Sequence, residues 1–331
     1  MSMNRRQFVA TAIAAMALPH ARSSLARSTH GIELGVQSFS FHEITQGGVD
    51  AIDMILDGCR QAGVDGCELW WPHAEPFPVP AYGAIRWKDT PSYKATVASG
   101  RMPEARALSL EEARALRARQ REWRENVPPG YFTAIRKRFQ ARGVKLIAYN
   151  YSFNNDMSDA ELEYGFKAAK ALGVSLITAS STLSAARRVP PLAERYKVRV
   201  AWHGHVAIDD PDALAGPESL LKAQGLSPWF RINLDCAHYS AAGFDPVAFI
   251  REHHDVITHI HLHDTKKGLP EVSTANGEGA TPIREVLALL KANPRWRLPV
   301  YYEYEWVGTG SSVDAIRQDL DYFRRAIGSD S

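Results

Sequence analysis

The sequence predicts an α/β protein that folds as a single-domain (β/α)8 barrel, and three observations support this. Short apolar segments alternate with amphipathic ones, which is the pattern of repeated βαβ units and a parallel sheet. A recurrent joint, in which a glycine ends a helix and an apolar strand follows, occurs at Gly63-Val64, Gly143-Val144 and Gly173-Val174. The length of 331 residues suits one barrel, since such domains commonly have about 250.

Eight strands and eight helices are expected in alternating order. Short apolar runs predict strands at 33–41, 66–71, 145–151, 175–180, 199–205, 230–235, 257–263 and 299–306. Amphipathic stretches predict helices at 49–62, 131–142, 158–172, 184–196, 216–224, 245–254, 281–292 and 312–326. Eight such units in one chain favour a closed barrel over an open, doubly wound sheet.

The connection between the second strand and its helix, residues 72–130, is unusually long. It carries prolines, aromatic residues and one predicted helix over 109–125. Strand-to-helix loops lie at the catalytic end of such barrels, so this insert is expected to be a lid or specificity element. A purely structural cover is an equally good interpretation, and the same residues could form the contact of a homo-oligomer.

The first 26 residues have the pattern of a twin-arginine (Tat) export signal. Arg5-Arg6 precedes an apolar run, Phe8 to Leu18, and Ser24-Leu25-Ala26 forms a small-x-small cleavage site. This run is too short to span a bilayer, which takes about 20 residues. We therefore expect a mature barrel domain over 27–331, without a stable membrane span, in the periplasm or secreted.

Composition narrows the class of partner. The formal net charge is only +2, and no stripe of lysines and arginines interleaved with aromatic residues marks a nucleic-acid surface. The three cysteines, Cys59, Cys67 and Cys236, have apolar neighbours and are expected to be buried thiols. A small molecule is therefore the expected partner, and nucleic acid is not.

Histidines and carboxylates gather where the last four predicted strands end, which is where active sites of these barrels lie. The segments are Trp202-His203-Gly204-His205, Leu234-Asp235-Cys236-Ala237-His238, His259-Ile260-His261-Leu262-His263-Asp264 and Tyr302-Glu303-Tyr304-Glu305-Trp306. Alternation along a strand puts His259, His261 and His263 on one face, and likewise Glu303 and Glu305. Burying so many polar groups unpaired is costly. Because imidazole and carboxylate suit first-row divalent metals, the pattern predicts a metal site.

These residues resemble the xylose-isomerase-like sugar phosphate isomerase/epimerase barrels, and the resemblance spans most of the chain from about 31 to 327. The motifs that carry it are Asp235-x-x-His238, His261-x-His263-Asp264, Gly277-Glu278-Gly279 and Tyr302-Glu303-Tyr304-Glu305. Each motif is weak alone, but their order and spacing together are fairly specific.

The resemblance implies a metal held by a glutamate, an aspartate, a histidine and a glutamate on strands five to eight. Asp235, His261 and Glu303 match directly, and His203 stands where the first glutamate is expected. His205 is a second candidate for that place. His238 resembles the family's substrate-contacting histidine. A shell of two histidines and two carboxylates suits Mn²⁺, Co²⁺, Zn²⁺ or Fe²⁺ better than Mg²⁺ or Ca²⁺, and Mn²⁺ is the first expectation.

The expected function is a metal-dependent sugar or keto-sugar isomerase or epimerase, which removes a proton next to a carbonyl that the metal polarises. Glu303 is the expected base, with His238 and Glu68 as further catalytic candidates. The expected substrate-binding residues, taken from the same end of the barrel, are His205, His263, Trp71 and Lys267.

His203 leaves two alternatives open, because a metal-bound imidazole is a poor base and the paired glutamates of the epimerases are then incomplete. A metal-dependent lyase or dehydratase acting on oxidised glycosides needs only one base, and export favours glycosides over sugar phosphates. A non-catalytic periplasmic sugar-binding subunit is the other alternative. Phosphodiester cleavage at a three-metal cluster is disfavoured, since strands three and four end in tyrosine, asparagine, threonine and serine.

Overall fold

The computed structural model describes residues 28–79, 109–267, 269–305 and 310–328. The predicted export signal (1–26), the central part of the insert (80–108) and Trp306 lie outside the described residues. Export and a lid role for the insert therefore stay predictions.

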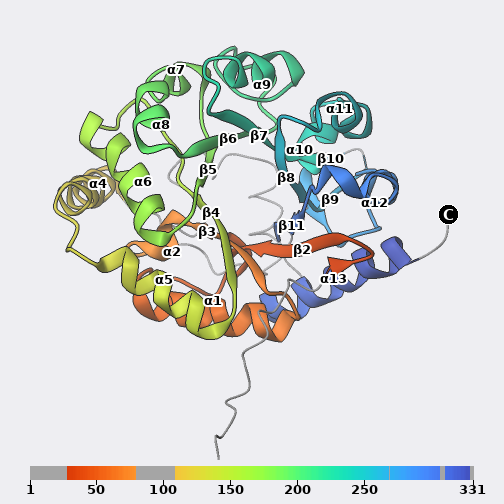
Figure 1. Cartoon of the computed structure of the whole chain (residues 1–331), viewed down its shortest axis with the longest axis horizontal. Coiled ribbons are helices and arrows are strands. Elements are labelled where there is room, and N and C mark those ends of the chain that lie inside the picture. The colour runs from red at the N-terminus through yellow and green to blue at the C-terminus, as the bar shows by residue number, and fades with distance from the viewer. Residues whose placement is uncertain (1–27, 80–108, 268, 306–309, 329–331) are drawn as a thin grey trace, which may run out of the picture.

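Eight parallel strands close into a barrel at the centre of the molecule, as predicted (Figure 1). They are β2 (Ile32–Gln37), β3 (Gly66–Trp70), β4 (Lys145–Asn150), β5 (Leu176–Ser180), β6 (Arg199–His203), β7 (Phe230–Asp235), β8 (Ile257–Leu262) and β11 (Val300–Tyr302). The ring closes where β11 pairs with β2, with Val300 opposite Leu34. All carboxyl ends therefore point to the same mouth.

The outer layer consists of helices that surround the barrel (Figure 1). They are α1 (Val49–Ala62), α5 (Tyr131–Arg142), α6 (Asp159–Leu172), α8 (Pro190–Tyr196), α9 (Pro217–Gln224), α11 (Pro246–His253), α12 (Ile283–Ala292) and α13 (Ser312–Gly328). The predicted glycine joints are confirmed, since Gly63, Gly143 and Gly173 end their helices in the left-handed conformation, with φ of 74°, 68° and 80°.

Four predicted boundaries are wrong. The strand expected at 33–41 ends at Gln37, where a 3-10 turn over Ser38–Ser40 begins. The strand expected at 199–205 ends at His203, because the chain turns at Gly204, where a Cβ would lie 2.2 Å from the carbonyl oxygen of Leu214. The strand expected at 299–306 ends at Tyr302. The helix expected at 184–196 is divided into α7 (Leu183–Ala186) and α8, because prolines at 190 and 191 cannot donate the N–H groups of a continuous helix.

Several short elements are absent from the sequence-based expectation. They are β1 (Ser28–Thr29), the 3-10 turns η1 (Ser38–Ser40) and η3 (Pro294–Trp296), α2 (Trp71–Ala74), α10 (Cys236–Ala241), and the hairpin of β9 (Asp264–Lys266) and β10 (Leu269–Thr274). α10 and the hairpin follow β7 and β8 directly, so they lie at the mouth of the barrel. Within the described part of the chain, no helix is both long and apolar enough to cross a membrane.

The described part of the insert is anchored to the outer layer. Helix α4 (Leu110–Glu125) confirms the helix predicted at 109–125 and lies outside α6 (Figure 1). Arg117 and Arg121 bond the carboxylate of Glu161 on α6. The buried guanidinium of Arg124 donates to both oxygens of Glu75, at 2.9 and 3.1 Å, and to Glu161 at 3.3 Å. An ion network therefore joins α4 to α6 and to Glu75, the residue that follows α2.

Candidate metal centre

Four side chains from four neighbouring strands meet at the mouth of the barrel. His203 ends β6, Asp235 ends β7, His261 lies in β8 and Glu303 follows β11 directly. The strand register is responsible, since Asp235 lies opposite His261. One potential ligand atom from each residue lies within 4.8 Å of the others, and all four residues are buried. The structure therefore brings together the four ligands expected from the sequence.

His261 is the centre of the hydrogen bonds at this site. Its Nδ1 lies 2.7 Å from Oε2 of Glu303, and its Nε2 lies 2.8 Å from Oε2 of Glu68. Burial lowers the pKa of His261, but the two carboxylates outweigh burial and hold that pKa well above its usual value.

Glu68 lies on the side of His261 opposite Glu303. It has no solvent exposure and bonds four side chains, those of Asn150, Thr178, His259 and His261. Burial raises the pKa of Glu68, but His261 and His259 more than compensate, so the pKa lies well below its usual value. Glu68, one of the catalytic candidates from the sequence, is thus a buried carboxylate whose hydrogen-bonding positions are filled by four donors.

Asp235 shapes the site with one carboxylate oxygen and exposes the other to it. Its Oδ1 accepts the backbone N–H of His238 at 2.7 Å and so caps α10. Its Oδ2 is buried and accepts no well-directed hydrogen bond from the described residues, although Nε2 of His263 lies 3.3 Å away as an ion-pair neighbour. A buried carboxylate oxygen that lacks a well-directed hydrogen bond is costly, and a cation would satisfy it.

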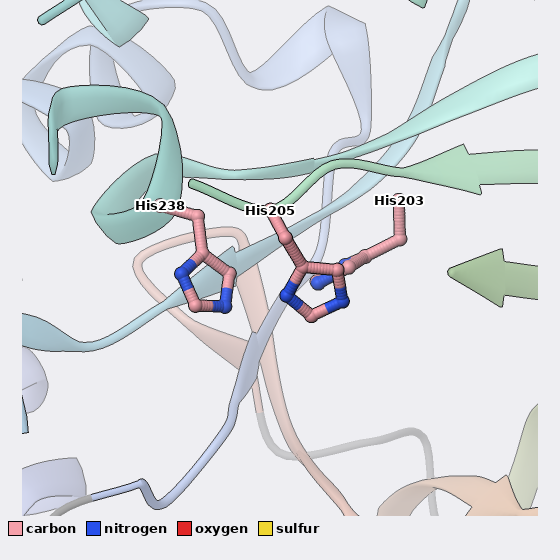
Figure 2. Close-up of side chains that lie close together, drawn as sticks. All are labelled: His203, His205 and His238. Carbon is pink, nitrogen blue, oxygen red and sulfur yellow. The ribbon is translucent and has the colours of Figure 1, made fainter. Parts of the chain in front are cut away.

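A second group of titratable side chains adjoins these four and contains His205, His238, His263 and Glu305. Figure 2 shows the rings of His203, His205 and His238 close together, with centroids 4.8 Å apart for His203–His205 and 4.7 Å for His205–His238. Nε2 of His238 lies 3.5 Å from Oε1 of Glu305. Burial lowers the pKa of His238, but Glu305 and Asp235 outweigh burial and raise it to about 10.

Sequence reasoning did not select Glu305 or Asn233 as site residues. The alternation expected for residues 299–306 already placed Glu305 on the same face as Glu303, and that was the signal that could have selected it. Asn233 lies between two ligand histidines, with its amide 3.4 Å from Nδ1 of His203 and 3.1 Å from Nε2 of His261. No local pattern marks this asparagine, because it becomes a neighbour of both histidines only when the strands pair.

The substrate-binding candidates are divided by the structure. His205 and His263 lie in the second group, where Nε2 of His263 is 3.3 Å from Oδ2 of Asp235. Trp71 packs one ring face against Arg124, at 4.7 Å from the guanidinium carbon. Lys267 is exposed on the β9–β10 hairpin. In the described residues, Trp71 and Lys267 therefore lie outside the cluster.

The Gly277-Glu278-Gly279 motif has a structural explanation. Asp264 accepts the N–H groups of Gly277 and Gly279 on one oxygen, and those of Thr265 and Thr281 on the other, all at 2.9 Å. A Cβ at Gly279 would lie 2.1 Å from the carbonyl oxygen of Thr265. Asp264 thus fixes the segment that connects the hairpin to α12.

The fold and the site together define a (β/α)8 barrel with a histidine–carboxylate centre at the carboxyl ends of its strands. The model of the xylose isomerase-like TIM barrel family matches residues 111–326, and the chain belongs to this family. A search of curated protein sequences finds no match.

Solved structures share the fold at low sequence identity. A protein described as the probable 3-DHS dehydratase AsbF of Bacillus anthracis has 14% identity and a TM-score of 0.55, covering 87% of this chain and 97% of that one. IolI with a bound zinc atom has 15% identity and a TM-score of 0.55, with coverage of 89% and 97%. An L-ribulose 3-epimerase has 13% identity and a TM-score of 0.55, with coverage of 89% and 94%.

Proposed function

We propose that this protein is a divalent-metal-dependent isomerase or epimerase of a sugar or keto-sugar. The observation that carries the proposal is the convergence of His203, Asp235, His261 and Glu303 within 4.8 Å at the mouth of the barrel. Membership of a family that includes sugar isomerases and epimerases supports it, as do solved relatives that are named as an epimerase and as a zinc-containing protein.

The four residues fit a divalent cation chemically. Nδ1 of His261 and Oε2 of Glu303 face each other at 2.7 Å, and Oδ2 of Asp235 is buried without a well-directed hydrogen bond. Asn233 contacts Nδ1 of His203, which leaves Nε2 of that ring available as a ligand. The two carboxylates balance the two positive charges of a divalent cation. The mixed set of nitrogen and oxygen ligand atoms favours Mn²⁺, Co²⁺, Zn²⁺ or Fe²⁺. Mn²⁺ is our first choice for reconstitution.

When bound, the cation supplies Lewis acidity that polarises a carbonyl and makes the neighbouring C–H more acidic. The two oxygens of Glu303 have different surroundings: Oε2 faces His261, whereas Oε1 accepts the amide N–H of Gln37 at 3.2 Å. Glu303 can therefore take a proton while it remains oriented. His238, held beside Glu305, is the second acid/base group in this proposal. Glu68 is not used as a base, because four side chains occupy its oxygens.

A second candidate function is a metal-dependent lyase or dehydratase, and the identity of His203 favours it. The side chain at the end of β6 is the imidazole of His203, whereas epimerisation by two glutamates needs a carboxylate at that place. Elimination needs one base and one acid, for which Glu303 and His238 suffice. One solved relative is described as a probable dehydratase.

Proton NMR in D2O separates these functions. The Mn²⁺-reconstituted protein is incubated with a panel of sugars and 3-keto-glycosides, alongside Glu303→Gln and the matched control Glu218→Gln, an exposed glutamate in the first turn of α9. Deuterium beside a carbonyl together with isomer formation supports the isomerase or epimerase. Release of water or an aglycone instead supports the lyase.

Two outcomes would contradict the proposal. Turnover that survives complete removal of metal by a chelator would exclude a metal-dependent mechanism. Absence of both exchange and turnover across the panel would favour the third possibility, a subunit that binds sugar without converting it. The Glu218→Gln protein should behave as wild type throughout, whereas Glu303→Gln should lose exchange.

We also propose that the protein is exported, on the pattern of residues 1–26 alone. Export would place it among glycosides rather than cytosolic sugar phosphates, which is why 3-keto-glycosides belong in the panel. Cell fractionation tests this: replacing Arg5 and Arg6 by lysine should retain the precursor in the cytosol. Unchanged export of that variant would show that the arginine pair has no such role.

A further inference from the structure

Glu68, on β3, is a fully buried carboxylate one side chain away from the proposed metal. Its Oε1 accepts the amide N–H of Asn150 at 3.1 Å and the hydroxyl of Thr178 at 2.5 Å. Its Oε2 accepts Nε2–H groups of His259 and His261, each at 2.8 Å. A carboxylate offers about four acceptor positions. All of them are filled by donors, which is the environment of a permanent negative charge.

The hydrogen bond to Glu68 determines which nitrogen of His261 can bind a metal. Nε2 has two polar neighbours, the carboxylate of Glu68 at 2.8 Å and the side-chain amide of Asn233 at 3.1 Å. The ionised carboxylate can only accept, so Nε2 carries the proton and the lone pair of the neutral ring is on Nδ1. Nδ1 is the atom that faces Glu303 at 2.7 Å. Neighbouring His259 has a defined orientation too, because its Nδ1 lies 2.9 Å from the hydroxyl of Thr258 and its Nε2 meets Glu68. The buried chain thus orients His261 towards the site.

The hydrogen bond between Glu68 and His261 also adds negative charge next to the proposed metal site. The four proposed ligands include only two carboxylates, Asp235 and Glu303, because β6 contributes His203. Glu68 adds a third negative charge, one hydrogen bond behind a ligand and fully shielded from solvent. A carboxylate that accepts the second N–H of a metal-binding imidazole increases the basicity of that ligand.

We infer that Glu68 is a positioning residue that sets the ligating nitrogen of His261 and supplies the negative charge that His203 does not. The inference rests on the proposed function, since it concerns the same metal. The role assigned to Glu68 is therefore to increase metal affinity and not to transfer a proton. This role also explains why a buried glutamate and a second buried histidine, His259, lie beneath the site.

The test is a Co²⁺ titration of the apoprotein, followed by visible absorption of the bound ion and by thermal unfolding. Glu68→Gln preserves size but removes the charge, and we expect its Co²⁺ affinity to fall by about 10- to 100-fold. The double variant Glu68→Gln/His203→Glu places a carboxylate directly among the ligands, and we expect it to recover most of the loss. Glu218→Gln is the matched control and should bind as wild type.

The outcomes are distinguishable from failure of the proposed function. Wild-type protein that binds no stoichiometric Co²⁺ would contradict the metal centre itself. Wild-type binding with equal affinity in Glu68→Gln would overturn only the present inference, as would a folded double variant that shows no recovery. If Glu68→Gln does not fold, Glu68→Asp takes its place in the test. Aspartate retains the negative charge, but its shorter side chain places the carboxylate farther from His261. We expect the Co²⁺ affinity of this variant to fall by about tenfold, and wild-type affinity would refute the inference.

Discussion

Replacement of Arg124 by methionine is the sharpest test of how the insert is anchored. The guanidinium is buried and neutralises Glu75, which has no solvent exposure either. Without Arg124, Glu75 keeps the hydroxyl of Tyr164 as a partner at 3.1 Å, but no positive charge. A buried carboxylate left in this state takes up a proton instead of remaining charged.

Proton uptake limits the cost and makes it depend on pH. Protonating a carboxyl group with an ordinary pKa of 4.5 costs about 1.4 kcal/mol for each pH unit above that value. The cost of leaving Glu75 without a positive partner is therefore limited to about 3.4 kcal/mol at pH 7 and about 0.7 kcal/mol at pH 5. The value at pH 7 agrees with the roughly 3–5 kcal/mol measured when a buried ion pair loses one partner. Arg124→Met should lose about 3 kcal/mol at pH 7 and much less at pH 5.

Urea unfolding of wild type and Arg124→Met at pH 5, 6 and 7 measures this difference. The double variant Arg124→Met/Glu75→Gln removes the titrating group, so its loss of stability should be smaller at pH 7 and independent of pH. A loss below about 1 kcal/mol at pH 7, well short of the range for broken buried pairs, would refute the reasoning. So would a loss that is the same at pH 5 and pH 7.

Three further predictions concern stability and metal. Burial raises the pKa of Glu161, but hydrogen bonds from Arg117 and Ser158 outweigh burial and lower that pKa to about 2. The stabilisation is therefore complete above the unfolded pKa of 4.5 and is lost as pH falls towards 2. The stability difference between wild type and Glu161→Gln should shrink over that interval in acid titrations, and a constant difference would contradict this. Asp264→Ala removes the acceptor of four N–H groups and should cost about 3–5 kcal/mol in urea unfolding, and Asp264→Asn, which keeps one acceptor oxygen, roughly half. Equal losses in the two variants would show that the retained oxygen contributes nothing. Removing bound metal with a chelator should lower the melting temperature by about 5–10 °C, since a ligand at a hundred times its Kd stabilises by about 2.7 kcal/mol. An unchanged melting temperature in calorimetry would argue against a bound metal.

The barrel could be predicted from the sequence because the information is local. Apolar runs, amphipathic periodicity and the glycines at 63, 143 and 173 act over a few residues, and eight repeats leave few topologies. The side chains at strand ends could be predicted for the same reason, because in a parallel barrel all carboxyl ends meet at one mouth. Asp235, His261 and Glu303 were therefore identified as neighbours although 68 positions separate the first from the last.

Tertiary structure alone decided how these side chains are paired. Glu68 and His261 lie on β3 and β8, 193 residues apart, and only the closed ring lets their side chains meet across its interior. Arg124 finds Glu75 only because α4 packs beside α6. Local patterns determine which element a residue occupies and which face it presents. Pairing between distant elements depends on register and closure, which no short stretch of this sequence contains.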